Sequence, residues 1–345
     1  MSDYRSNTTI AEIAKRLLAA RRILITTHAK PDGDAMGSCL ALARALESKG
    51  RVASIFIAGP IERALFALAG TTPFTNLERQ PPGDDYDAAV VVDTGAWSQL
   101  EAMKSWLQKH HSKVIGVDHH PRGDSDVAAL RIVDSDAVST TAVLVPLIEA
   151  LGFDLCQGSG GVNSVAEALF AGLATDSGWF RYPNATADAF TLAAKLLACG
   201  VDKPRLYQIL EENYQPTRLA MEARALASLE YARGGAFATI TLTAVDFTET
   251  GAAVEELTGI VNLPMVVGAV RASILIAQEK PGDVVKLSFR SKGAPPGAPA
   301  DQFVDVNVLA AKFGGGGHVH ASGAKVKGKD LATVKSDVLA AVESF

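Results

Sequence analysis

Short apolar runs that end in acidic or histidine residues recur along the first third of this 345-residue chain. Segments with the spacing of amphipathic helices, such as 35–49, lie between these runs. Strands that alternate with helices predict a parallel sheet built from βαβ units. The runs, each with the polar residues that follow it, are 23–25 with His28, Asp32 and Asp34, 88–92 with Asp93, and 114–117 with Asp118, His119 and His120.

The length of the chain and a change of pattern along it indicate two domains. Residues 138–199 have mostly helical spacing, interrupted around Asp176, and apolar strands return beyond Gly234 and Gly235. We therefore expect an α/β protein whose larger N-terminal domain has a parallel sheet and a helical second half. The expected parts are an N-terminal domain at 1–215, a linker at 216–235, and a smaller α/β C-terminal domain at 236–345 with a proline- and glycine-rich loop at 293–300.

Composition limits the partners and the compartment. The formal net charge of −5 argues against a broad basic track for long nucleic acids, so any phosphate binding should be local. No apolar run is long enough to cross a bilayer, and we expect no membrane partner. Cys39 and Cys199 fall in apolar helical segments and are expected to be buried thiols rather than bridges or ligands. This use of cysteine favours a reducing cytoplasm.

The strand-end carboxylates and imidazoles predict a metal site. Parallel strands all end at one edge of a sheet, so these groups should crowd together, and crowded carboxylates repel one another unless cations neutralise them. A donor set of carboxylates with one or two imidazoles per ion, and no thiolate, suits Mn²⁺, and Mg²⁺ less well. Two such ions about 3.5–4 Å apart favour in-line displacement at phosphorus. The pattern therefore predicts phosphate-ester hydrolysis. Acyl transfer would require a serine or cysteine nucleophile, and none is evident in the sequence.

A second cluster lies near the C-terminus. The run of four glycines at 314–317 can form an anion-binding nest of backbone amides, and His318 adds a donor beside it. Arg290 ends an apolar strand, where its guanidinium could grip a phosphate. Read alone, four glycines are equally consistent with a flexible hinge.

In order, these motifs resemble those of the DHH phosphoesterase family. The matching motifs are His28-x3-Asp32-x-Asp34, Asp93, Asp118-His119-His120 and Thr175-Asp176-Ser177. The resemblance implies one metal held by His28, Asp32 and Asp93, and another held by Asp34, His119 and Asp176, with Asp93 shared. It implies further that His120 contacts the scissile phosphate or protonates the leaving oxygen, and that Asp118 orients the histidines, so His120, Asp93 and Asp118 are the expected catalytic residues.

The C-terminal part resembles the DHH-associated domain of the same family. The residues that carry this resemblance are Arg290, Asp305-Val306-Asn307, Gly315-Gly316-Gly317-His318 and Ala321-Ser322-Gly323. In that family the second domain closes over the metal site and holds the nucleotide. The resemblance therefore implies a substrate-binding set of Arg290, Ser291, Gly316, Gly317 and His318.

The resemblance is strongest to the compact branch of the family that trims short RNA and removes a phosphate from 3′-phosphoadenosine-5′-phosphate. We expect a manganese-dependent enzyme that hydrolyses short oligoribonucleotides to mononucleotides, 3′-phosphoadenosine-5′-phosphate to AMP, or both. Related compact members cleave cyclic di-AMP or pApA, which stays an alternative. A manganese pyrophosphatase is a rival that the glycine-histidine run disfavours. A catalytically silent nucleotide-binding protein is another rival, which the complete ligand set disfavours. A homodimer is left open.

Overall fold

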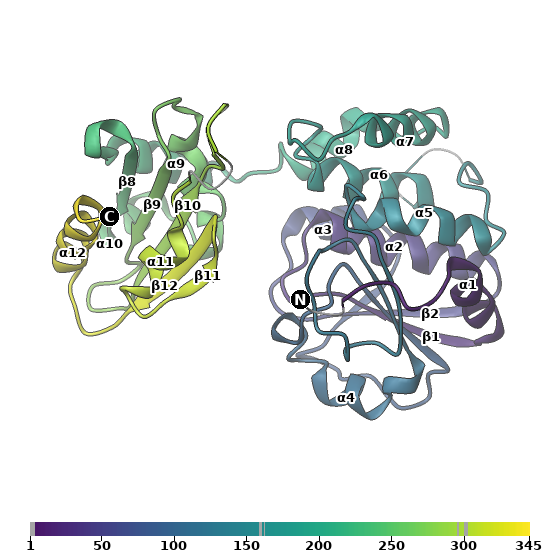
Figure 1. The fold of residues 1–345 in the computed structure, drawn as a ribbon. Helices are drawn as coiled ribbons and strands as arrows, with labels where there is room; N and C mark the ends of the chain where they lie inside the picture. The colour runs from purple at the N-terminus through teal and green to yellow at the C-terminus, as the bar shows by residue number, and fades with distance from the viewer. Residues whose placement is uncertain (1–3, 159–160, 162, 295–296, 300–302) are drawn as a thin grey trace. The chain divides into compact units, whose positions relative to one another are not determined.

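The computed structural model describes residues 4–158, 161, 163–294, 297–299 and 303–345 (Figure 1). Within it the chain divides into two compact units, Met1–Asn213 and Tyr214–Phe345. The loop expected at 293–300 lies partly outside the described residues. Each unit contains one six-stranded sheet.

The sheet of the first unit is parallel throughout, which confirms the predicted α/β class. Its strand order is β3-β2-β1-β4-β5-β6, so the chain changes direction across the sheet between β1 and β4. In open α/β sheets such a switch point leaves a crevice outside the carboxyl ends of the strands. The strands are β1 (Arg22–Thr26), β2 (Val52–Ile57), β3 (Phe74–Asn76), β4 (Ala88–Val92), β5 (Val114–Asp118) and β6 (Leu130–Val133).

Alternation along the central strands assigns each side chain to one of two cores. Ile23 and Ile25 of β1 pack into the larger core, which includes residues of the helices after β1 and β6, whereas Leu24 packs on the opposite face with Leu107. Figure 1 shows α4 on one side of the sheet and α2 on the other, with α5 to α8 beyond α2. The helices are α1 (Ile10–Ala19), α2 (Gly33–Ser48), α3 (Arg63–Ala69), α4 (Lys104–Lys109), α5 (Thr140–Ala150), α6 (Val165–Asp176), α7 (Ala187–Ala198) and α8 (Lys203–Leu210).

Helices α2 and α6 approach closely because Gly37 of α2 faces the backbone of α6, and Gly172 of α6 leaves room for the side chains of Asp34 and Thr141. A Cβ atom on Gly37 of α2 would lie 2.5 Å from the carbonyl oxygen of Ala168 in α6. A Cβ on Gly172 of α6 would lie 2.5 Å from Oδ1 of Asp34 and 2.4 Å from Thr141. No side chain fits at either position, so the first turn of α2 is held against both α5 and α6.

The second unit is also α/β, with a mixed sheet in the order β11-β12-β10-β9-β8-β7. Only β8 and β9 pair in parallel, and the remaining pairs are antiparallel. One face packs against α11 and α12 around Phe289, and the other packs against α9 and α10 around Leu275. The elements are α9 (Pro216–Ala227), β7 (Glu230–Ala232), β8 (Phe237–Leu242), α10 (Ala244–Thr250), β9 (Ala272–Ala277), β10 (Val285–Ser291), α11 (Val306–Ala311), β11 (Gly316–His318), β12 (Ala321–Val326) and α12 (Leu331–Glu343).

Residues 216–235, which we expected to be a linker, are instead folded. They form α9 and β7 and belong to the second unit. Met221 and Ala225 of α9 are fully buried in the core that includes Ile240 of β8. The amphipathic spacing of α9 reflects this packing, which the sequence pattern did not distinguish from a connecting helix.

The prediction for Cys199 is wrong. Cys199, at the end of α7, forms a disulfide with Cys156 in the turn after α5, and their Cα atoms lie 4.5 Å apart. Packing brings together two cysteines that are 43 positions apart, and the sequence spacing gave no sign of this. Cys39 is a buried free thiol, as predicted. Within the described part of the chain, no helix has the length and apolar character needed to cross a membrane.

Candidate metal centre

The carboxyl ends of β1, β4 and β5 deliver polar side chains to one edge of the sheet. His28 follows β1 by two residues, Asp93 directly follows β4, and Asp118 is the last residue of β5. Asp93 has φ = 61°, a left-handed conformation that aspartate adopts more readily than most residues. This turn places the Asp93 carboxylate between the ends of the neighbouring strands.

One group of donor atoms consists of His28, Asp32 and Asp93. Nε2 of His28 lies 3.5 Å from Oδ2 of Asp93 and 4.0 Å from Oδ1 of Asp32. Nδ1 of His28 lies 3.1 Å from the carbonyl oxygen of Ala29, which favours a proton on Nδ1. Nε2 then has a lone pair available for a metal ion. Asp32 also caps α2, accepting from the amides of Asp34 and Ala35.

A second group consists of Asp34, His119 and Asp176. Nε2 of His119 lies 3.5 Å from Oδ2 of Asp176 and 3.7 Å from Oδ1 of Asp93. Nδ1 of His119 lies 3.2 Å from the carbonyl oxygen of Ala137, the same orienting arrangement as at His28. Asp93 also groups with His119 and His120, so its carboxylate reaches both clusters.

Asp34 is fixed by the start of another helix. It lies in the first turn of α2, is 1% exposed, and accepts hydrogen bonds from the backbone amides of Thr140 (2.7 Å) and Thr141 (3.0 Å) at the start of α5. The hydroxyl of Thr140 donates to Oδ1 of Asp93 at 2.9 Å. These bonds orient two carboxylates from different elements toward one place.

Burial and mutual repulsion disfavour the negative charges of the carboxylates at this centre. Burial raises the pKa of Asp34, and burial with the neighbouring Asp34 and Asp32 raises the pKa of Asp93 well above its usual value. Burial and the same two aspartates raise the pKa of Asp176 to about 7. Crowded carboxylates with oriented imidazoles fit hard or borderline divalent cations, so the acidic and histidine groups of this centre can bind metal.

Asp118 does not belong to either group, and its carboxylate instead accepts hydrogen bonds from residues around the two groups. It is fully buried and accepts hydrogen bonds from the Tyr4 hydroxyl (2.6 Å), the His119 amide (2.8 Å) and Nδ1 of His120 (2.8 Å). Burial alone would raise the pKa of Asp118, but the bonds from His120 and Tyr4 lower it overall. Asp118 in turn raises the pKa of His120, whose half-exposed ring borders Asp93 at 3.9 Å.

The predicted substrate-binding residues lie on the second unit. Arg290 of β10 and His318 of β11 both pair with Ala321 of β12, so the two residues share one face of the sheet, two strand spacings (about 10 Å) apart. Gly316 and Gly323, paired in register, lie on the same face. The floor between Arg290 and His318 is therefore made of alanine and glycine.

Gly317 and Ser291 lie on the opposite face of this sheet from Arg290. Gly317 pairs with Ser322, which pairs with Phe289 of the core, and Oγ of Ser291 lies 2.9 Å from Nδ1 of His320. Gly317 has φ = 150°, and a Cβ there would lie 2.6 Å from the carbonyl oxygen of Ala321. The glycine run is thus needed for close strand packing, and part of it forms β11 rather than an open nest.

Sequence reasoning missed residues that support the centre. Tyr4 lies far from the motifs in sequence, and no local pattern indicates its contact with Asp118. Thr140 and Thr141 follow Ser139, whose side chain caps α5. A serine-threonine cluster before an apolar run is a helix-start signal, and it could have shown that free amides lie there.

Comparison with known proteins identifies the family. The model of the DHH family, N-terminal domain, matches residues 22–173. A bifunctional oligoribonuclease and PAP phosphatase NrnA of Thermus thermophilus is 31% identical, over 96% of this chain and 92% of its own length. The chain belongs to the DHH family of phosphoesterases. It is a hydrolase of phosphoric esters, and its sequence is of the NrnA type.

One further relative and one solved structure are similar to this DHH phosphoesterase over nearly its whole length. A Bacillus subtilis bifunctional oligoribonuclease and PAP phosphatase NrnA is 25% identical, over 93% of this chain and 94% of its own. The crystal structure of an exopolyphosphatase-related protein from Bacteroides fragilis has the same fold, with a TM-score of 0.85 and 23% identity over 100% of this chain and 99% of its own. The fold likeness therefore extends over both units of the DHH protein.

Proposed function

We propose that this phosphoesterase hydrolyses short oligoribonucleotides to mononucleotides, and 3′-phosphoadenosine-5′-phosphate to AMP, with two Mn²⁺ ions. The observation that carries the proposal is the position of Asp93, whose carboxylate groups with His28 and Asp32 and also lies 3.7 Å from Nε2 of His119, a member of the other donor group. A carboxylate that reaches two sites can bind two neighbouring ions at once, which favours a two-metal centre over two independent metal sites. The two NrnA relatives, named as oligoribonucleases and PAP phosphatases, support this substrate class.

The residues fit the proposed ions as follows. His28, Asp32 and Asp93 would hold one ion, and Asp34, His119 and Asp176 the other. When bound, a pair of divalent cations neutralises charge on the phosphoryl oxygens and makes water a stronger nucleophile. Mn²⁺ accepts this mixture of carboxylate and imidazole more readily than Mg²⁺, which prefers oxygen ligands.

His120 is the proposed proton donor. Its Nδ1 bonds to the buried carboxylate of Asp118, which raises the pKa of His120 and favours the protonated ring near neutral pH. The other ring nitrogen is then free to contact the scissile phosphate and to protonate the leaving oxygen. Asp118 and Tyr4 act through His120, as positioning residues.

Arg290 and His318 are the proposed grip on the nucleotide. Their common face offers a guanidinium and an imidazole on either side of small residues, Ala321, Gly316 and Gly323. Burial lowers the pKa of Arg290. A guanidinium nevertheless keeps its charge in proteins. This second-unit face would select nucleotides over inorganic pyrophosphate. We keep the cytoplasm as the proposed compartment because the proposed substrates are short RNA and nucleotides; the Cys156–Cys199 disulfide removes the support expected from the cysteines.

A substrate panel tests the proposal. The protein with Mn²⁺ is incubated separately with a 5′-labelled RNA trimer, 3′-phosphoadenosine-5′-phosphate, pApA, cyclic di-AMP and pyrophosphate. We expect kcat/KM to be highest for the trimer or the phosphoadenosine phosphate. Faster turnover of cyclic di-AMP or pApA would move the assignment to those dinucleotides. Turnover of pyrophosphate alone, or of nothing with both sites loaded, would refute the proposal.

A further inference from the structure

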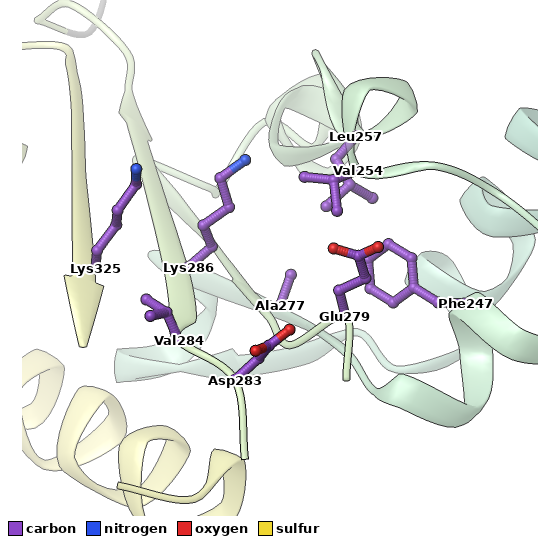
Figure 2. Close-up of a pocket in the computed structure, with 9 residues that line it drawn as sticks. All are labelled: Phe247, Val254, Leu257, Ala277, Glu279, Asp283, Val284, Lys286 and Lys325. Carbon is purple, nitrogen blue, oxygen red and sulfur yellow. The ribbon is translucent and has the colours of Figure 1, made fainter. Parts of the chain in front are cut away.

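The second unit contains a pocket that the proposed function does not use. Its volume is about 320 Å³, at the small end of the range for ligand sites. It opens beside the N-terminal end of β10, on the face of the sheet that also carries Arg290. Figure 2 shows its lining, which consists of Phe247, Val254, Leu257, Ala277, Glu279, Asp283, Val284, Lys286 and Lys325.

Two lysines form one wall of this pocket. Lys286 of β10 and Lys325 of β12 are directly paired across the antiparallel ladder, which puts their Cα atoms about 5 Å apart. In Figure 2 their side chains extend in parallel and their amino groups point to the same side. Like charges at opposed positions destabilise a sheet, and neither lysine has an ion pair with any described residue. The pair is therefore suited to a dianion, such as a phosphate monoester, which carries about −1.5 to −2 charges.

The opposite side of the pocket offers acceptors and an apolar floor. Glu279 and Asp283 are exposed, and their carboxylates make no ion pair within the described parts of the chain. In the view of Figure 2 both carboxylates lie away from the lysine amino groups. Phe247 and Leu257, buried against α9 and β8, close the pocket with an aromatic ring and an aliphatic side chain.

We propose that this pocket binds a nucleoside monophosphate, separately from the metal centre. Lys286 and Lys325 would hold the phosphate, Phe247 and Leu257 would contact the flat base, and Glu279 would accept from an exocyclic amino group. A phosphate on one wall and an amino donor on the other match the separated charges of the pocket. Arg290 lies four residues beyond Lys286 along β10, about 13 Å away. The phosphate that Arg290 is proposed to bind is therefore not the one proposed for Lys286 and Lys325. If the proposed function holds, the ligand is of the product class.

Equilibrium dialysis of the full-length protein with AMP tests this site, with EDTA present to exclude metal. The variant Lys286→Gln/Lys325→Gln removes both positive charges and should bind AMP at least about tenfold more weakly than the wild type at this site. The control variant Lys280→Gln/Lys327→Gln removes two exposed lysines outside the pocket and should bind normally. Thermal unfolding of each variant shows that the fold is retained.

Two further arms separate this pocket from the Arg290 face and identify the base contact. In an Arg290→Ala background AMP binding at the pocket should persist, and it should then be lost with Lys286→Gln/Lys325→Gln. IMP, which lacks the exocyclic amino group, should bind about threefold or more weaker than AMP, and Glu279→Gln should abolish that difference. Binding of AMP that is unchanged by the lysine substitutions, or that Arg290→Ala removes entirely, would overturn the proposal. Absence of AMP binding to the wild type would do the same.

Discussion

The hydroxyl of Tyr4 donates a 2.6 Å hydrogen bond to the carboxylate of Asp118, across 114 positions of sequence. The ring of Tyr4 is buried and packs where Gly95 and Gly123 leave no Cβ: a Cβ on Gly95 would lie 2.0 Å from its hydroxyl oxygen. Burial and the adjacent Asp118 raise the pKa of Tyr4, so the phenol stays protonated and remains a donor. The N-terminal segment thus supports the aspartate that orients His120.

Removing the Tyr4 hydroxyl should lower the stability of the fold. In Tyr4→Phe, one oxygen of the buried Asp118 loses its partner, which should cost about 1–3 kcal/mol in the free energy of unfolding. Because the bond lowers the pKa of Asp118, the deficit should be full at pH 7 and should shrink only as the pH falls below about 4, the usual pKa of an aspartate. Urea unfolding at pH 7 and pH 3 measures this. Tyr86→Phe, a buried tyrosine with no such bond, is the control, and an equal loss there would contradict the assignment.

Asp93→Asn should abolish turnover by weakening both metal sites. The amide keeps the size and the left-handed backbone preference of aspartate but removes the shared negative charge. We expect kcat to fall by at least about 10³-fold, with metal content reduced from two ions toward none. Elemental analysis after gel filtration and single-turnover assays report the two effects. The exposed Asp84→Asn serves as the control, and a fully metal-loaded, active Asp93→Asn enzyme would disprove the shared-ligand role.

Metal uptake should release protons near neutral pH. In the metal-free fold the pKa of Asp176 is raised to about 7, above its usual value of about 3.9, and the pKa of Asp93 is raised as well. The bound protons stabilise the metal-free fold at low pH, and this stability is lost as the pH rises from about 4 through 7. Mn²⁺ must displace these protons, so its affinity should increase with pH.

Calorimetry in two buffers of different ionisation enthalpy counts the released protons. We expect about one or more per protein at pH 6.5 and fewer at pH 8.5. Asp176→Asn should release fewer protons than the wild type at pH 6.5. No buffer dependence at pH 6.5 would show that the carboxylates are already ionised in the metal-free protein.

Arg290→Ala should impair substrate binding more than chemistry. Its guanidinium lies on the second unit, whereas all of the proposed metal ligands belong to the first, so metal content should be unchanged. Loss of a charged grip on a nucleotide should raise KM for phosphoadenosine phosphate at least about tenfold with little change in kcat. Lys280→Ala is the matched loss of charge in the same unit. A fall in kcat at unchanged KM would instead place Arg290 in the chemical step.

Reduction of the Cys156–Cys199 bridge should destabilise the first unit. The bridge closes a loop of about 43 residues, for which chain entropy predicts about 4 kcal/mol of stabilisation. Melting with and without reductant should therefore differ by several degrees in Tm. Cys156→Ser should reproduce the reduced protein and be insensitive to reductant. Equal Tm values under both conditions would show that the bridge does not form in solution.

The convergence of the acidic and histidine side chains at one edge of the sheet could be predicted because it depends on regular structure. His28, Asp93 and Asp118 follow strands whose apolar runs are visible in the sequence, and parallel pairing then brings their ends to one edge. The parallel α/β class follows from the same pattern. What the pattern gives is therefore the set of elements and the edge they share.

The contacts that hold the centre depend on packing, which the sequence pattern does not contain. Tyr4 reaches Asp118 only because the N-terminal segment crosses the loops after β4 and β5, and Cys199 meets Cys156 only through the stacking of α7 on α5 and α6. The segment 216–235 reads as a connecting helix until its burial on β8 is seen. Helical spacing shows which side of a helix is apolar, but not which unit that side faces.

The backbone contact between α2 and α6 at Gly37 also limits how far apart Asp34 and Asp176 can move. Asp34 lies in the first turn of α2 and Asp176 at the end of α6, and at Gly37 no side chain separates the two helices. The spacing of these two proposed ligands is therefore fixed by the thickness of the polypeptide itself. Changes in the surrounding core can then alter the protein's stability while leaving the geometry of this proposed site nearly constant.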